Sequence, residues 1–225
     1  MLARHLVLLA GLLVALPALA QKAPAPAPGR LPAKDVVAKM QAFYEKIQDL
    51  KADFKQEISS PTTGRTKTTY GVVKLKKPGK MRWDYAKPEK KHFISDGTVL
   101  WVYEPEDQQA FKQELKSQNL SAAVTFLTGK GKLADEFNFE LLADGAVGQK
   151  GDYAVKLTPK VPSAQFKTIT LVVDAKAFQV KLSVVATPDG GQSKVWFTGI
   201  DLNKKIDDKV FKFTPPAGVR VIVAK

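Results

Sequence analysis

The sequence predicts a mainly β protein with one antiparallel sheet of about ten strands, one helix before it and one inserted in its middle. Turn signals such as Pro-Gly, Asp-Gly and Gly-Gly recur about every ten residues beyond residue 60. Between the turns, apolar and polar residues mostly alternate, which is the period of a half-buried strand. Three- and four-residue spacing of apolar residues, typical of helices, is confined to two segments. Many strands and few helices favour a single sheet over alternating β-α units.

The first helical segment begins at Lys34 and precedes all the strands. Its apolar residues recur at helical spacing and so share one face of an amphipathic helix: Val36, Val37, Met40, Phe43, Tyr44, Ile47 and Leu50. The second helical segment is 119–128, in which Leu120, Val124 and Leu127 have the same spacing. Gly129 is suited to end it.

Strands follow the first helix almost without interruption. Segment 50–58 alternates and is followed by a turn at 60–65. Asp96-Gly97 predicts a two-residue hairpin in which Phe93 faces Leu100 and His92 faces Trp101. The other expected strands are 66–76, 81–85, 137–142, 153–159, 166–174, 178–187, 193–200 and 210–213.

The first twenty residues predict export. Arg4 and His5 precede an apolar run, Leu6–Leu16, which is shorter than the roughly 20 residues that span a bilayer. Ala18-Leu19-Ala20 then provides a cleavage site. We therefore expect a signal peptide at 1–20, an extended Ala/Pro-rich spacer at 21–33 and one folded domain at 34–225. The sequence has no cysteine, so no lipid anchor is expected on the mature N-terminus.

The charge balance is strongly basic, with a net charge of +13. Beyond the predicted leader only four arginines occur, and the remaining basic residues are lysines. Lysine is a hydrated point charge that reads bases and phosphates poorly, so with predicted export we expect no nucleic-acid partner. The lysines suit either weak attraction to anionic membranes and acidic partners or solubility, and the sequence alone leaves both open.

The residues needed for most enzyme chemistry are absent. Without cysteine and with only two histidines, His5 and His92, thiolate sites and histidine-rich metal sites are excluded. His92 is expected to stack on Trp101 as a structural residue. Acidic clusters occur at 104–107 and 207–208. Paired carboxylates are able to do acid–base work, but such clusters in turns are usually solvated, so we expect no catalytic site, metal or cofactor.

The apolar residues exceed what a flat sheet with two short helices requires. Met81, Trp83 and Tyr85 share one face of a strand, and the first helix adds its own apolar face. A curved sheet with helices across its mouth would enclose a lipid-sized cavity. An ordinary filled core explains the same composition equally well, and the residues alone do not decide between the two.

Four motifs, in order, resemble those of the LolA family of periplasmic lipoprotein carriers. They are LKADFKQ at 50–56, GVVKLKKPGKMRWDYAKPEKKHFISDGTVLWVYEP at 71–105, LTPK at 157–160 and FKFTPPAGV at 211–219. The second is the most similar: a basic residue before a proline, an aromatic-rich strand, Ser-Asp-Gly and Leu-Trp-x-Tyr-x-Pro. The resemblance covers about residues 35–223.

The resemblance implies an unclosed barrel of ten or eleven antiparallel strands, with helices forming a lid over an apolar cavity. It implies a monomeric periplasmic carrier that is not an enzyme. Such a carrier takes acylated lipoproteins from an inner-membrane ABC transporter that releases them, and delivers them to an outer-membrane receptor.

The family's cavity positions match Tyr44, Ile58, Met81, Trp83 and Phe93, and its lid helix contains Val124 and Leu127. With the apolar positions noted above, the expected lipid-binding cavity comprises Met40, Tyr44, Ile47, Ile58, Met81, Trp83, Phe93, Leu100, Val124 and Leu127.

One position departs from the family pattern. The family has an arginine immediately before the turn proline, where it ties the barrel to its lid, and here the residue is Lys77. An arginine could donate to two lid carbonyls at once, whereas lysine lacks this fork and points only one compact ammonium at them, which would hold the lid more weakly.

Two other functions remain compatible with the sequence. The same fold would serve a periplasmic carrier or sensor of another amphiphile, such as a glycolipid or phospholipid. The second alternative is a periplasmic enzyme that uses an acidic cluster. Bound lipid on the purified protein would favour a carrier, and substrate turnover would favour an enzyme.

Overall fold

The computed structural model of the protein describes residues 29–115 and 132–223. Its elements are α1 (Ala33–Lys46), β1 (Asp49–Ser59), β2 (Thr66–Lys76), β3 (Lys80–Lys87), β4 (Lys91–Ser95), β5 (Val99–Glu104), β6 (Gln109–Glu114), α3 (Leu133–Glu136), β7 (Phe137–Leu141), β8 (Tyr153–Pro159), β9 (Thr168–Val173), β10 (Val180–Ala186), β11 (Gln192–Leu202), the 3₁₀ helix η1 (Asp208–Phe211) and β12 (Arg220–Val223).

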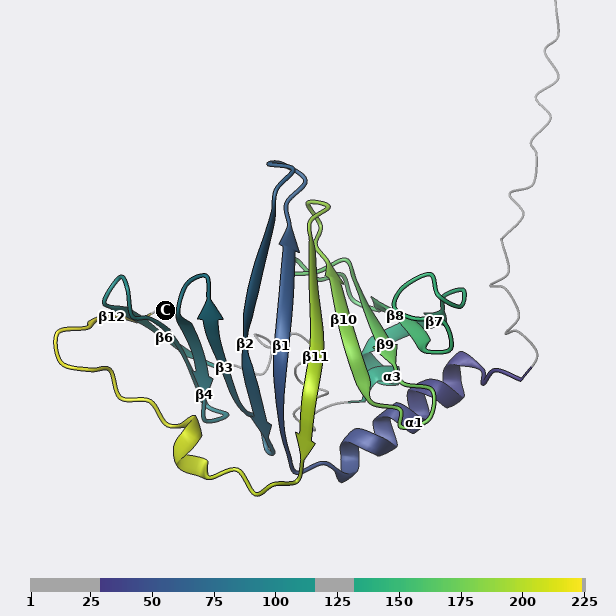
Figure 1. Cartoon of the computed structure of the whole chain (residues 1–225), viewed down its shortest axis with the longest axis horizontal. Coiled ribbons are helices and arrows are strands. Elements are labelled where there is room, and N and C mark those ends of the chain that lie inside the picture. The colour runs from purple at the N-terminus through teal and green to yellow at the C-terminus, as the bar shows by residue number, and fades with distance from the viewer. Residues whose placement is uncertain (1–28, 116–131, 224–225) are drawn as a thin grey trace, which may run out of the picture.

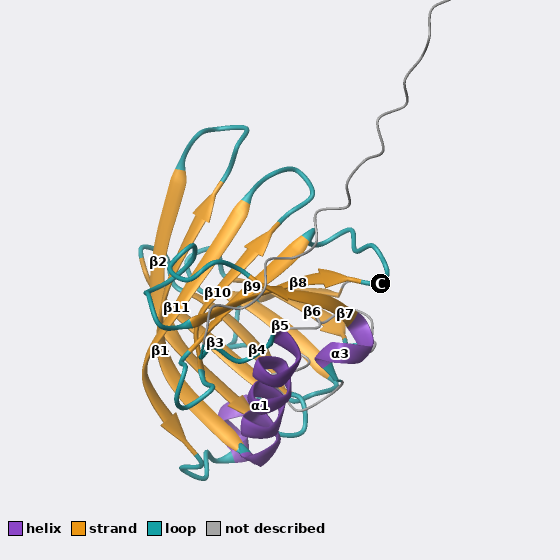
Figure 2. Cartoon of the chain, turned by 90° about the vertical axis from the view of Figure 1, so that its right-hand side faces the viewer, coloured by secondary structure: helices purple, strands orange, loops and turns teal. Residues whose placement is uncertain are grey.

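The strands of the described chain form one 12-stranded sheet in the order β12-β6-β5-β4-β3-β2-β1-β11-β10-β9-β8-β7. In this described sheet the two end strands, β7 and β12, do not pair with each other, so the sheet is open. Figures 1 and 2 show that it curves and that α1 and α3 lie on the same side of it. We call the side that faces α1 the inner face and the opposite side the outer face.

The long central strands agree with the sequence analysis. β1, β2 and β11 each have 11 residues. β1 and β2 pair along their whole length: Ser59 lies opposite Thr66 at one end, and Asp49 lies opposite Lys76 at the other. The expected strands 66–76 and 153–159 match β2 and β8 residue for residue. The predicted single open sheet is therefore confirmed, with more strands than the ten or eleven expected.

The first helix ends earlier than its apolar pattern predicts. Ile47 already has an extended backbone, and Leu50 belongs to β1. At the other end, packing begins inside the expected spacer. The Arg30 guanidinium lies 4.5 Å from the ring centroid of Tyr153 and donates to Asp144 at 2.7 Å.

The predicted hairpin at Asp96-Gly97 has a different register. Ser95 pairs with Leu100, Phe93 with Val102 and His92 with Tyr103, so pairing is displaced by two residues. The reason is a longer loop: the Asp96 carboxylate accepts from two backbone N–H groups downstream, at 2.8 and 3.0 Å, and holds a wider turn. A shift of two preserves the faces, so Phe93 and Leu100 still share the inner face.

The C-terminal segment differs most from the prediction. Segment 210–213 is not a strand: η1 ends at Phe211, whose ring is 1% exposed. The Arg82 guanidinium donates to the carbonyl of Val210 at 3.1 Å, and Phe213 packs on Trp101 and Tyr103. The alternating apolar residues are thus buried against the outer face. The last described element is β12, which pairs in parallel with β6 rather than antiparallel.

Asp208 attaches this segment to the β2–β3 hairpin. Its carboxylate lies 2.7 Å from the ammonium of Lys76 and 2.6 Å from that of Lys80. Hydrogen bonds from these two lysines lower the pKa of Asp208 from 3.8 to about 2.

We expect the contribution of Asp208 to stability to depend on pH. Because its folded-state pKa is depressed, the contribution is present above pH 3.8 and is lost as the pH falls to about 2. Urea unfolding of wild type and Asp208→Asn should therefore give different midpoints at pH 6 that converge near pH 2. If the two urea midpoints differed as much at pH 2 as at pH 6, the ion pairs of Asp208 would not be the source of the difference.

Candidate functional site

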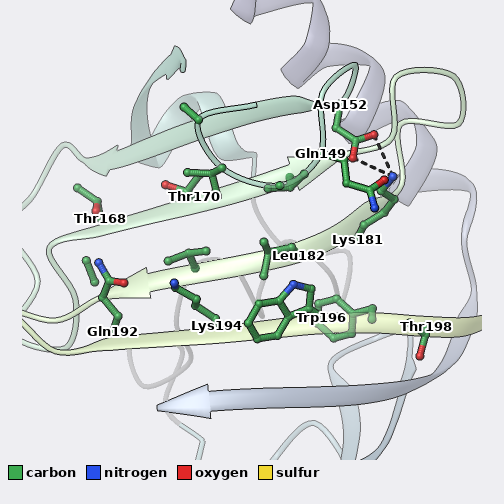
Figure 3. Close-up of a pocket in the computed structure, with 17 residues that line it drawn as sticks. Gln149, Asp152, Thr168, Thr170, Lys181, Leu182, Gln192, Lys194, Trp196 and Thr198 are labelled. Carbon is green, nitrogen blue, oxygen red and sulfur yellow. Dashed lines mark hydrogen bonds and ion pairs between the residues drawn. The ribbon is translucent and has the colours of Figure 1, made fainter. Parts of the chain in front are cut away.

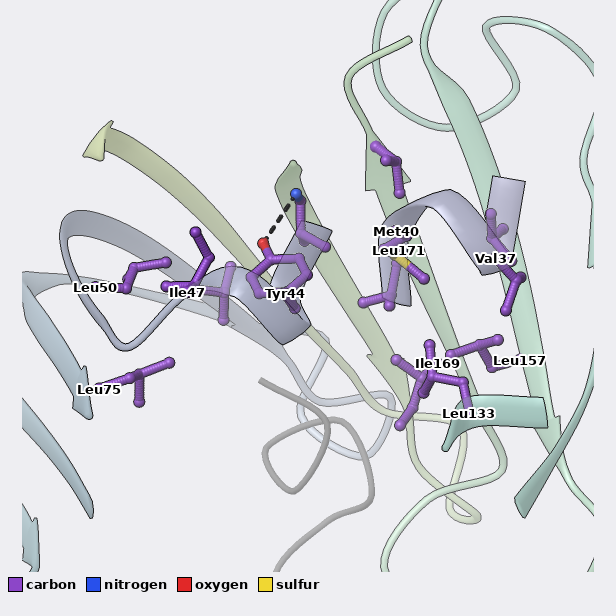
Figure 4. Close-up of a cluster of buried hydrophobic side chains, with 14 of the residues drawn as sticks. Val37, Met40, Tyr44, Ile47, Leu50, Leu75, Leu133, Leu157, Ile169 and Leu171 are labelled. Carbon is purple, nitrogen blue, oxygen red and sulfur yellow. Dashed lines mark hydrogen bonds between the residues drawn. The ribbon is translucent and has the colours of Figure 1, made fainter. Parts of the chain in front are cut away.

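One face of α1 covers the inner side of the sheet. Val36, Val37, Met40 and Tyr44 are each at most 4% exposed and recur at helical spacing. They share one cluster with inner side chains of the far strands, among them Leu157, Ile169 and Leu171. Figure 4 shows this helix face lying over those strands. The helix is therefore held mainly by apolar burial.

Polar bonds hold the C-terminal end of α1. The Tyr44 hydroxyl accepts from the backbone N–H of Val180 at 3.1 Å (Figure 4), and burial raises the pKa of this hydroxyl, so it stays protonated. Lys77, in the turn between β2 and β3, donates from Nζ to the carbonyls of Tyr44 at 2.8 Å and Glu45 at 2.9 Å. Carbonyls in the last helical turn lack helical partners and lie at the negative end of the helix dipole.

The single ammonium of Lys77 therefore reaches both carbonyls, and whether it holds the helix more weakly than an arginine would stays a prediction. Burial lowers the pKa of Lys77, and the nearby Glu45 charge partly offsets this. The contact joins the sheet to the helix end, in the place where the sequence analysis put a latch.

Aromatic side chains cover the inner face beside α1. The rings of Phe54 and Trp83 lie 5.0 Å apart and those of Phe54 and Tyr85 4.9 Å apart, both edge to face. Trp83 also approaches Phe197 at 6.2 Å, and Tyr85 approaches Phe93 at 5.7 Å. Such pairs add about 0.5–1.5 kcal/mol each beyond burial. Four strands, β1, β3, β4 and β11, contribute to this aromatic cluster.

A polar group that the sequence analysis missed borders the aromatic cluster. Gln56 Oε1 accepts from the Tyr85 hydroxyl at 2.9 Å, and Gln56 Nε2 donates to Ser193 at 2.9 Å. Burial raises the pKa of Tyr85 to about 12. The only sequence signal for this polar group is that Gln56 lies two residues after Phe54 and so faces the same side of β1.

The structure brings most of the predicted cavity residues together. Met40, Tyr44, Ile47 and Met81 are buried in one cluster, and Trp83 and Leu100 pack against it. Phe93 joins through Tyr85. Ile58 is separate: it lies near the end of β1 and is 43% exposed. Val124 and Leu127 lie outside the described residues.

The space between α1 and the sheet is nearly filled. A cavity of about 20 Å³ lies among nine residues that include Tyr44, Trp83 and Phe197, and another of about 10 Å³ lies beside Lys77. Ligand sites usually measure about 300–1,000 Å³. Both volumes are far below that range. The expected lipid-sized cavity also includes Val124 and Leu127, which lie outside the described residues, so it stays a prediction.

Comparison with known proteins identifies the family. The family model "Outer membrane lipoprotein carrier protein LolA" matches residues 45–214. The chain belongs to the LolA family.

Named relatives and a solved structure agree. A Nitrosospira multiformis protein named outer-membrane lipoprotein carrier protein is 31% identical over 189 residues, which are 83% of this chain and 87% of that protein. A Methylococcus capsulatus protein of the same name is 29% identical over 191 residues, 84% and 88% of the two chains. The crystal structure of an uncharacterized conserved protein from Thermus thermophilus aligns with a TM-score of 0.55 at 10% identity. It covers 85% of this chain and 99% of that one, and it supports the fold alone.

His92, the histidine considered above as a structural residue, makes two contacts in this LolA family member. His92 stacks on Tyr103 at 5.9 Å, not on Trp101 as expected, because of the displaced register. Its Nδ1 lies 2.7 Å from the Asp84 carboxylate. Burial raises the pKa of Asp84, but hydrogen bonds with His92 and Arg82 and the nearby charges outweigh this and lower it overall.

Across 29–115 and 132–223 no group of three or more His, Asp or Glu side chains is arranged to hold a metal ion. Nor does any helix within these ranges have the length and apolar character needed to cross a membrane.

We expect Lys77→Leu to loosen the end of α1. The carbonyls of Tyr44 and Glu45 lose a charged donor, at a cost of about 1–3 kcal/mol. Amide hydrogen exchange in the last turn of α1 should accelerate, while exchange in β8 and β9 stays unchanged. Lys80→Met is the matched control, because Lys80 pairs with Asp208 and not with α1. Equal exchange in both variants would show that Lys77 does not hold the helix.

Proposed function

We propose that the protein carries lipoproteins through the periplasm. It would receive acylated lipoproteins from an inner-membrane ABC transporter that releases them and deliver them to an outer-membrane receptor. Family membership and the names of its relatives support this proposal. The predicted signal peptide at 1–20 supports the compartment, with a spacer at 21–33 and the carrier domain beyond it.

The observation that carries the proposal is an amphipathic helix lying on an apolar, aromatic inner face of an open sheet. Acyl chains need such a surface, and the open sheet provides it without closing around them. The nearly filled space under α1 means that loading requires α1 to move away. The acyl chains then occupy the positions that the α1 side chains leave over the far strands, and they extend along the inner face to Met81, Trp83 and Phe93.

The free energies are of comparable size. Burying one large apolar side chain contributes about 1.5–3 kcal/mol, and each acyl methylene contributes about 0.8 kcal/mol. Burial of about ten acyl methylenes therefore offsets the exposure of three to five large apolar side chains of α1. Exchange of one apolar occupant for another needs no chemical step, so the carrier acts without catalysis.

The contact of Lys77 with the two α1 carbonyls is the proposed latch. Because it joins the β2–β3 turn to the moving helix, it would be broken on loading and remade on delivery. In this proposal the monomer is the working unit, and residues Met40, Tyr44, Ile47 and Leu100 line the loaded site. Ile58, at the exposed end of β1, lies at its rim.

We expect Phe93→Glu to abolish lipoprotein loading, since a carboxylate beside acyl chains is strongly disfavoured. The protein is purified from its own periplasm and its bound mass is measured by native mass spectrometry. Wild type should carry a lipoprotein, and Phe93→Glu should be empty but folded by circular dichroism.

Val161→Glu is the matched control, because Val161 is 79% exposed in a loop. It should load as wild type does. Equal loading of Phe93→Glu and Val161→Glu would overturn the site. Exclusive recovery of phospholipid or glycolipid would replace lipoproteins with another amphiphile as the cargo.

A further inference from the structure

The outer face of β9, β10 and β11 carries a groove that the carrier function does not use. Its volume is about 790 Å³, within the range of ligand sites. Trp196 and Leu182 contribute to it, whereas Val195, the neighbour of Trp196, belongs to the inner cluster. Phe197 borders the groove and also packs against the inner cluster. Because successive residues of a strand face opposite sides, the groove and the inner face are separated by the sheet. Figure 3 shows the groove with its lining side chains.

The wall of the groove is fixed by the loop between β7 and β8. Gly148, with φ +79°, is so close to Val172 that an added Cβ would lie 2.6 Å from a Val172 methyl carbon. Asp144 accepts from the N–H of Gly151 at 2.9 Å. Lys181 forms an ion pair with Asp152 at 2.8 Å on the same side (Figure 3). The groove is therefore preformed.

The groove combines an aromatic ring with hydroxyl and amide side chains. Trp196 is partly buried beside Leu182 and Val184. Thr170 lies level with Lys194, and Thr168 and Gln192 lie four residues along the strands from Trp196, at the other end of the groove (Figure 3). The side chains of these three residues make no hydrogen bond within the described residues. A sugar ring has an apolar C–H face that stacks on an aromatic ring and a rim of hydroxyls that bind such groups.

The charges of the groove favour an acidic ligand. Lys194 lines it and has no ion pair in the described part of the chain, whereas Lys181 is neutralised by Asp152. Lys55, which lies 5.2 Å from the Trp196 ring centroid, is paired with Glu57 at 2.7 Å. Lys194 and Trp196 are two residues apart on one face of β11, so their Cα atoms are about 7 Å apart. This distance matches the length of one or two sugar units.

The same geometry argues against two other occupants. A peptide strand would need free backbone groups, but β10 is paired on both sides, with β9 and β11. An acyl chain would leave the polar side chains of Thr168, Thr170 and Gln192, which line the groove, without partners.

We propose that this outer-face groove binds an acidic oligosaccharide, with one sugar ring on Trp196 and a carboxylate beside Lys194. The proposal is independent of lipoprotein carriage, because it uses the opposite face of the sheet.

Titration calorimetry with two matched tetrasaccharides tests the proposal. One contains alternating N-acetylglucosamine and N-acetylmuramic acid, and the other is chitotetraose, which lacks the carboxylates. Wild type should prefer the acidic sugar about fivefold, the effect expected of one exposed charge pair. Trp196→Ala should weaken both sugars about tenfold, because the stacking platform is lost.

Lys194→Gln should remove the preference for the acidic sugar and leave chitotetraose unchanged. Lys212→Gln makes the same charge change on an exposed lysine of the C-terminal segment and should bind as wild type does. Binding of neither sugar at millimolar concentration, equal binding by Trp196→Ala, or equal losses in Lys194→Gln and Lys212→Gln would each overturn the proposal. Equally tight binding of hexaglutamate would show a general anion surface and would also overturn it.

Lipoprotein loading separates this proposal from the carrier function. Trp196→Ala and Lys194→Gln should load lipoprotein as wild type does, and Phe93→Glu should still bind the acidic sugar. Failure of sugar binding with normal loading overturns the groove alone, and failure of loading with normal sugar binding overturns the carrier alone.

Discussion

The packing of α1 on the inner face of the sheet is the interaction on which the rest of the structure depends. An open sheet cannot bury its inner face by closing on itself, so a separate element must cover it, and α1 does so over the far strands β7 and β8. The buried face of α1 contributes about 1.5–3 kcal/mol for each large side chain, and the polar bonds to Val180 and Lys77 fix its end. Apolar burial of this kind is non-directional, which is why another apolar occupant is able to replace it.

The junction between α1 and β1 is held much more firmly than the helix itself. The Asp49 carboxylate is 4% exposed and accepts from the backbone N–H groups of Lys204 and Lys205 at 2.8 and 3.1 Å. The Gln48 N–H donates to the Asn203 side chain at 2.7 Å, and the Gln48 carbonyl accepts from the Lys77 N–H at 2.9 Å. Directional bonds thus fix the junction, whereas side-chain burial holds the body of α1. A displacement of α1 would therefore leave the start of β1 and the C-terminal segment in place.

Periodicity and turn chemistry predict what is local, and they succeed where local signals decide. The strands around 60–65 follow from alternation and a strong turn signal, and the face shared by Phe93 and Leu100 survives even a wrong register. The register itself depends on the Asp96 carboxylate, which selects a longer loop. The sequence of segment 210–213 predicts a strand because its apolar and polar residues alternate. The same alternation buries Phe211 against the sheet without any pairing between strands. The nearly filled inner space follows from how closely α1 approaches the sheet, and residue spacing carries no information on that distance.

The alternation along β11 also explains how one strand takes part in two surfaces. Val195 and Phe197 face α1, while Trp196 between them faces outward. A Trp on the outer face is costly in water unless something covers it, and Lys55 with Leu182 and Val184 covers it only in part. The surrounding threonines and glutamines then keep that face wet enough to avoid non-specific apolar association. The inner face is mainly apolar and is covered in part by α1, and the outer groove depends on the loop between β7 and β8. A ligand on one side of the sheet therefore has no need to disturb the other.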